Sequence, residues 1–229
     1  RRVMKLKTMC LLMIAGLLLI VDIPVYWREV VVFRSMPYMW VNGLVRVIGA
    51  VLLLVFCTQA VQLMKSRYMK VARNCVAGIL TYYIVYTILC FLLEVVQIQP
   101  FVELYPLVYG HMYALRSNLS ILEDITNLIA VGIDILQFVM ICFLLSAGVE
   151  CGGQRHGFQV LRRCYIIVWI LYYVGFNILF MQYVGLEHYW SLIVWFLLPY
   201  ALNLGVGIAA VRFLRQGKTY TTFADLTSL

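Results

Sequence analysis

Long apolar segments, separated by short stretches rich in basic and aromatic residues, recur along almost the whole chain. A helix needs about 20 mostly apolar residues to cross the hydrocarbon core of a bilayer. Six segments approach or exceed that length: residues 8–27, 38–63, 74–96, 122–147, 164–184 and 189–213. The pattern therefore predicts an all-α fold, a polytopic transmembrane bundle of six helices. We expect residues 1–215 to form this one domain and residues 216–229 to form a short polar cytoplasmic tail.

The basic residues between the segments predict the orientation of the bundle. Fourteen of the 18 lysines and arginines precede the first segment, lie in the second–third and fourth–fifth connections, or lie at the end of the sixth segment and after it. Positive charge collects on the cytoplasmic side of membrane proteins. Both termini are therefore expected in the cytoplasm, together with the basic connections at residues 65–73 and 151–163. The longest outer connection is then residues 97–120.

Composition agrees with a membrane protein, since 64% of the residues are hydrophobic and only 12% are charged, against about 25% charged in soluble domains. The net charge of +8 follows from the basic clusters on one side of the bundle. We expect these clusters to contact anionic lipid head groups of the bilayer, and we expect no nucleic-acid partner. In a eukaryotic cell, we expect this membrane to be the plasma membrane or an endolysosomal membrane.

A polar stripe interrupts the fourth apolar segment. Asn127, Asp134 and Gln137 are spaced so that a helix places them on one face. A charge at the bilayer centre costs at least about 2.5–3.5 kcal/mol on insertion scales, and intramembrane carboxylates are candidate functional sites for that reason. Asn203 in the sixth segment lies at a similar depth, so we predict one polar cluster inside the bundle. The cluster either binds a solute or ion, or holds the helices together by hydrogen bonds.

Two further residue sets are predicted to have structural roles. Arg46 shares a depth with Asp22 and Glu94, and an ion pair among them would lower the cost of burying all three. Small residues also recur at every fourth position of the sixth segment: Ala201, Gly205 and Ala209. Such a stripe lets helix backbones approach closely. It indicates either a helix contact inside the bundle or an interface between subunits.

Enzyme chemistry finds no support in the sequence, which lacks nucleophile-elbow, P-loop, zinc-protease and dinucleotide-binding motifs. The cysteines and histidines also lack zinc-ligand spacing, so we expect no enzyme, no cofactor and no metal site. Two functions stay open. A channel- or transporter-type protein or subunit would move a small solute or ion along the polar face of the fourth segment. A non-catalytic accessory, scaffold or sensor subunit would associate with a partner protein, as a homo-oligomer or within a larger membrane complex.

Overall fold

The protein is all-helical in the part of the chain that the structure describes. A computed structural model describes residues 6–21, 39–64, 66–92, 120–151, 155–174 and 189–216. These ranges contain six helices and no strand. The helices are α1 (Leu6–Leu19), α4 (Met39–Met64), α5 (Arg67–Phe91), α8 (Ser120–Cys151), α9 (Arg155–Val174) and α11 (Tyr189–Gln216).

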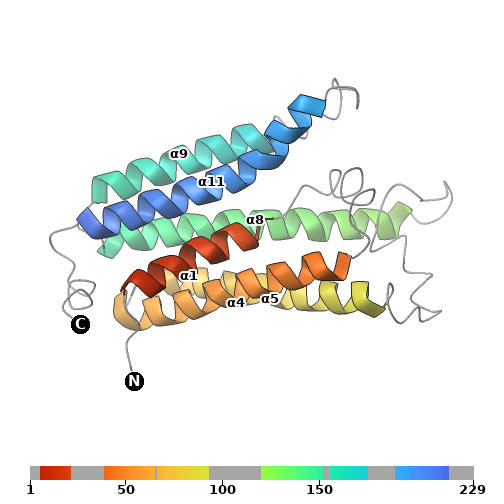
Figure 1. Ribbon diagram of the computed structural model, residues 1–229, viewed down its shortest axis with the longest axis horizontal. Coiled ribbons are helices and arrows are strands. Elements are labelled where there is room, and N and C mark those ends of the chain that lie inside the picture. The colour runs from red at the N-terminus through yellow and green to blue at the C-terminus, as the bar shows by residue number, and fades with distance from the viewer. Residues whose placement is uncertain are drawn as a thin grey trace.

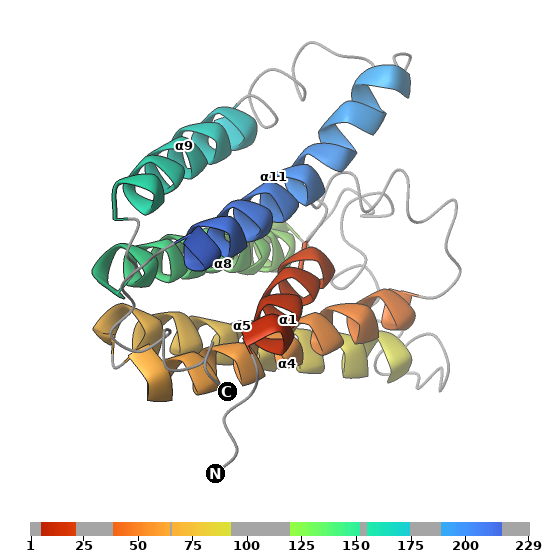
Figure 2. The same cartoon turned by 60° about the vertical axis from the view of Figure 1, so that its left-hand side comes forward.

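The six helices form a closed ring in chain order. Each helix packs mainly against the helix before it and the helix after it, and α11 closes the ring by packing against α1. Six helix ends lie together at one end of the bundle (Figure 1). They are the start of α1, the end of α4 and start of α5, the end of α8 and start of α9, and the end of α11. We call this the junction end. Seen from the second direction, α1 lies between α11 on one side and α4 and α5 on the other (Figure 2).

Three of these helices are long and apolar enough to cross a membrane, over Trp40–Leu63, Arg67–Leu89 and Val131–Glu150. The stretches Lys7–Leu19 and Leu197–Phe213 are shorter apolar helices. The outer face of α4 is aliphatic, and its exposed side chains recur at helical spacing: Val41, Leu44, Val45, Ile48, Val51 and Val55. An exposed apolar surface of this kind is unusual for a soluble protein and suits contact with lipid.

Three predicted segment boundaries are wrong. Helix α5 begins at Arg67 and not at residue 74, and α9 begins at Arg155 and not at residue 164. Arginine and lysine are good helix formers, so both helices continue into basic sequence that hydropathy assigns to connections. The first segment is wrong in the opposite sense, because α1 ends at Leu19 although the apolar sequence runs to residue 27.

Polar contacts fix the helices at the junction end. Ser66 precedes the first residue of α5, and its hydroxyl donates a hydrogen bond to the Glu150 carboxylate near the end of α8. On α9, Arg162 Nη1 donates to Ser146 Oγ of α8 at 2.9 Å. These contacts connect the start of α5 and the side of α9 to α8, and so fix the position of the three helices along one another.

Candidate functional site: the end of helix α1

The candidate site lies at the C-terminal end of α1, where backbone carbonyl groups accept hydrogen bonds from side chains of other helices. The last helical hydrogen bond described here runs from the Ile20 amide to the Gly16 carbonyl at 3.0 Å. Four residues after Ile20 the sequence has Pro24, which has no amide hydrogen and whose ring would clash with the carbonyl of Ile20 in a continuing helix. The last carbonyl groups of a helix need donors from elsewhere. Those of α1 find them on four other helices.

Two of the donors come from helices on either side of α1. Arg46 Nη1 of α4 donates to the Val21 carbonyl at 2.7 Å. Asn203 Nδ2 of α11 donates to the Leu17 carbonyl at 2.9 Å. Arg46 is 3% exposed and Asn203 is 8% exposed, so both hydrogen bonds are shielded from solvent. The end of α1 is therefore held between its two neighbours in the ring.

Two more donors reach the same turn from α5 and α8. Gln137 Nε2 donates both to the Ile20 carbonyl at 3.2 Å and to the Tyr83 hydroxyl at 2.8 Å. The Tyr83 hydroxyl in turn donates to the Ile20 carbonyl at 3.5 Å. We call the four side chains of Arg46, Tyr83, Gln137 and Asn203, together with the carbonyl groups that they contact, the polar layer.

The electrostatics of the polar layer favour a cation beside α1. The carbonyl end of a helix carries partial negative charge, which stabilises a nearby positive group by about 0.3–1 kcal/mol and by more when partly buried. The guanidinium carbon of Arg46 also lies 5.7 Å from the centre of the Tyr83 ring. A desolvated cation–π contact of this kind adds about 2 kcal/mol. A charge this deeply buried is therefore held by a helix end, an aromatic ring and a hydrogen bond.

Two glycines bring α1 and α4 close enough for these contacts. A Cβ placed on Gly49 would lie 2.9 Å from the Ile20 backbone nitrogen, and one placed on Gly16 would lie 3.1 Å from the Gly49 carbonyl oxygen. Any larger residue would push one backbone away from the other. The close crossing therefore requires glycine at both positions, and it sets the place where the end of α1 meets Arg46.

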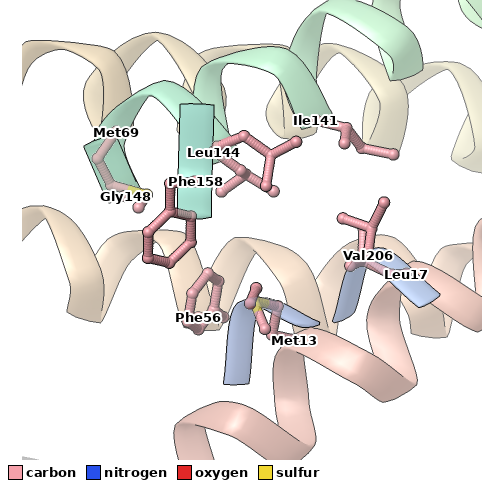
Figure 3. A pocket seen from close by; sticks show the side chains of 11 residues that line it. Met13, Leu17, Phe56, Met69, Ile141, Leu144, Gly148, Phe158 and Val206 are labelled. Carbon is pink, nitrogen blue, oxygen red and sulfur yellow. The ribbon is translucent and has the colours of Figure 1, made fainter. Parts of the chain in front are cut away.

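An apolar cavity of about 40 Å³ adjoins the polar layer on the side of the junction end. All six helices contribute to its lining, with one representative each in Met13, Phe56, Met69, Ile141, Phe158 and Val206. Figure 3 shows these side chains around the cavity, together with Leu17. Leu17 belongs to both regions, because its side chain lines the cavity and its carbonyl accepts from Asn203. The interior of the ring is thus divided into a polar layer and an apolar layer.

The residues of the predicted polar cluster take different places. Gln137 and Asn203 both reach the end of α1, where they bind different carbonyl groups. Asp134 is half-buried on α8 and interacts electrostatically with Tyr172 and Tyr173 of α9. Its predicted position beside Asn203 stays a prediction.

Three other predicted site residues lie where the structure gives no side-chain description. Asn127 belongs to α8, but its side chain is outside the described part of the chain, as are Asp22 and Glu94 as a whole. The ion pair predicted for Arg46 with the two carboxylates therefore stays a prediction.

The small-residue stripe of α11 does not mediate the contact with α1. Ala201 and Gly205 are exposed, and a Cβ on Gly205 would meet no atom within 4 Å. Ala209 is half-buried. Gly207, two residues along, is the position that faces α1, where a Cβ would lie 3.1 Å from Ile14 Cγ1. Ala201 and Gly205 therefore face outward in the single chain. The predicted role of the stripe, as a helix contact inside the bundle or as an interface between subunits, stays a prediction.

Comparisons with protein-family models, with curated proteins and with solved structures found no match for this chain. Any proposal of function must therefore rest on the chemistry of the polar layer and on its place in the ring of helices.

Proposed function

We propose that this chain is an integral membrane protein in which all six helices enter the bilayer and both termini are cytoplasmic. The three long apolar helices and the aliphatic outer face of α4 support membrane insertion. The shared position of the two helix junctions, the start of α1 and the end of α11 supports an even number of passes (Figure 1). The junction end also carries the exposed basic residues Arg67, Lys70, Arg155, Arg163 and Arg212, as expected for the cytoplasmic side.

Within this bundle, α1 is too short to cross by itself. Its 14 residues extend about 21 Å, against a hydrocarbon core of about 30 Å. Starting from the cytoplasmic side, it would end inside the membrane. In many transporters, discontinuous helices end near the bilayer centre, and their free backbone groups there form the substrate and ion sites.

We propose that the protein is a channel- or transporter-type protein or subunit that moves a small solute or ion through the ring. The observation that carries this proposal is the end of α1, where side chains from four other helices meet backbone carbonyl groups. The solute would bind at the polar layer, with Gln137 contributing from the polar face of α8. The adjoining apolar layer would act as a closed barrier, because hydrophobic constrictions stop polar solutes by excluding water.

Flux measurements on the purified protein in liposomes test this proposal. The probes are protons, followed by an internal pH dye, and radioactive sodium, rubidium and chloride. We expect one of these to cross faster than in protein-free liposomes, and Gln137→Leu to remove the excess. Gln62→Leu is the matched control, because Gln62 is an exposed glutamine of α4. Flux that is the same with and without protein, or equal loss in both variants, would contradict a role for the polar layer in transport.

A second candidate is the non-catalytic accessory, scaffold or sensor subunit, and the outward stripe of α11 favours it. Gly205 has open space around it and is flanked by the exposed side chains of Leu204 and Ile208. Such a surface suits close packing against a helix of another chain. Purification in mild detergent separates the two functions: an accessory subunit should elute with another membrane protein or a second copy, whereas a self-sufficient transporter need not.

A further inference from the structure

We propose that the apolar cavity at the centre of the ring is a binding site for a small apolar molecule, of the size of xenon, dioxygen or ethylene. The site lies where all six helices meet, among Met13 of α1, Phe56 of α4, Met69 of α5, Phe158 of α9 and their neighbours on α8 and α11. This inference goes beyond the proposed transport and does not depend on it, because it requires no solute to cross the membrane.

The chemistry of the lining determines the class of ligand. Eleven residues line the cavity, all within the described helices, and none of them carries a nitrogen or oxygen atom in its side chain. A water molecule needs about two to four polar partners in a buried site, so this cavity does not suit water. An ion or a polar molecule would lose its hydration here without replacement. An apolar molecule enters without that cost.

Burial of the lining gives an apolar molecule a reason to bind. Leu17 is 1% exposed, Met69 is 2% exposed and Phe158 is 3% exposed. Apolar atoms that face an empty space lack van der Waals partners on that side. A molecule that fills the space supplies those contacts and removes its own apolar surface from water. Dry apolar cavities inside proteins bind xenon and benzene on this basis.

The volume of the cavity limits the size of the ligand. A dry cavity of about 150 Å³ accommodates benzene, whereas this one has a volume of about 40 Å³. Met13 and Met69 line it with unbranched side chains that adapt to irregular gaps. The Phe158 ring is less free to move, because it packs edge-on against the Phe213 ring with their centres 5.3 Å apart. The site therefore suits xenon or ethylene and excludes benzene.

The packing of the ring provides a route into the cavity. Among neighbouring helices of the ring, α9 and α11 share the least packing. Both helices line the cavity, α9 through Phe158 and α11 through Val206 and Ala210. With the ring in a bilayer, as proposed above, an apolar molecule dissolved in the hydrocarbon core would enter between these two helices.

Methionine methyl groups in the lining test the inference directly. The purified protein, with isotope-labelled methionine methyl groups, is studied in detergent by NMR under increasing xenon pressure. We expect the Met13 and Met69 signals to shift and then saturate. Met140 is the internal control, because it is 0% exposed but does not line the cavity, and its signal should stay in place. Methanol, which is small but polar, and benzene, which is too large, should leave all three signals unchanged.

Filling the cavity with a side chain should remove the site. Ala210 lines the cavity and is 6% exposed, so Ala210→Leu should abolish the xenon shifts at Met13 and Met69. Ala77→Leu is the matched control, because it adds the same atoms at an exposed position of α5, and it should leave the shifts unchanged. If Ala210→Leu does not fold, Val206→Ile enlarges another lining residue and should raise the xenon pressure at half-saturation.

The outcomes separate this inference from the transport proposal. Saturating xenon shifts at Met13 and Met69 that the cavity-filling variant reduces support the inference even if no probe ion crosses the liposome membrane. Shifts that do not saturate, an equal response of Met140, an equal response to methanol or benzene, or shifts that persist unchanged in the folded cavity-filling variant would overturn it. None of these results depends on the flux that the protein shows.

Discussion

Replacing Gly49 by alanine tests the close crossing that places the end of α1. Alanine in a helix is favoured over glycine by about 0.5–1 kcal/mol. The added Cβ, however, would lie 2.6 Å from Leu19 Cβ and 2.9 Å from the Ile20 nitrogen, and backbone atoms cannot rotate away. Overpacking of this kind costs about 1–3 kcal/mol. We therefore expect a net loss of about 1–2 kcal/mol in the free energy of unfolding.

The matched control is Gly205→Ala, where the new Cβ meets no atom within 4 Å. Helix propensity alone should then leave stability unchanged or raise it by up to about 1 kcal/mol. Thermal melting in one detergent measures both variants. A chain of 229 residues shifts by roughly 2–4 °C for each kcal/mol, so Gly49→Ala should melt about 2–8 °C lower. Equal or higher melting of Gly49→Ala would show that α1 and α4 are further apart than described here.

Three further predictions concern charge and topology. If the Asp134 carboxylate carries protons or cations, Asp134→Asn should abolish transport while the protein still folds. If the carboxylate has only a structural role, Asp134→Asn should be tolerated and Asp134→Leu should lower stability. Flux measurements and melting curves of both variants distinguish the two cases. Arg46→Ala should lower stability by several kcal/mol at most, and combining it with Glu94→Ala should restore part of the loss; simple additivity in a double-mutant cycle would show that the two are not partners. Single-cysteine labelling in intact cells should find residues 65–73 protected and residues 100–120 accessible, and the reverse result would invert the proposed orientation.

Hydropathy predicted the helical class and the approximate positions of the six helices in the described part of the chain. The same signal misplaced the starts of α5 and α9, since it measures transfer into lipid and not helix formation. It also ran past the end of α1. Pro24 was the available sign of that end, because it removes the donor that the Ile20 carbonyl would need.

The candidate site was predictable only in part. Gln137 and Asn203 were singled out because an amide in an apolar segment must have a partner. Both amides bind carbonyl groups at the end of α1, and Gln137 also binds the Tyr83 hydroxyl. Nothing in the sequence distinguished Tyr83 as part of the polar layer, since tyrosines are frequent at membrane interfaces. Gly16 and Gly49 are far apart in the sequence and meet only through the crossing of two helices. Such tertiary contacts cannot be obtained from periodicity within one segment.

The end of α1 and the four polar side chains around it satisfy each other's hydrogen-bonding groups inside an apolar bundle. A helix that stops among apolar residues leaves carbonyl groups that cost several kcal/mol each without donors. An arginine, two amides and a tyrosine inside the same bundle would be costly without acceptors. Together they satisfy each other, so neither feature can be lost alone without leaving buried polar atoms unpaired. This mutual dependence would hold for a purely structural cap as well as for a solute site. The two differ in whether a solute crosses the membrane at the polar layer, and the flux of Gln137→Leu compared with that of Gln62→Leu measures this difference.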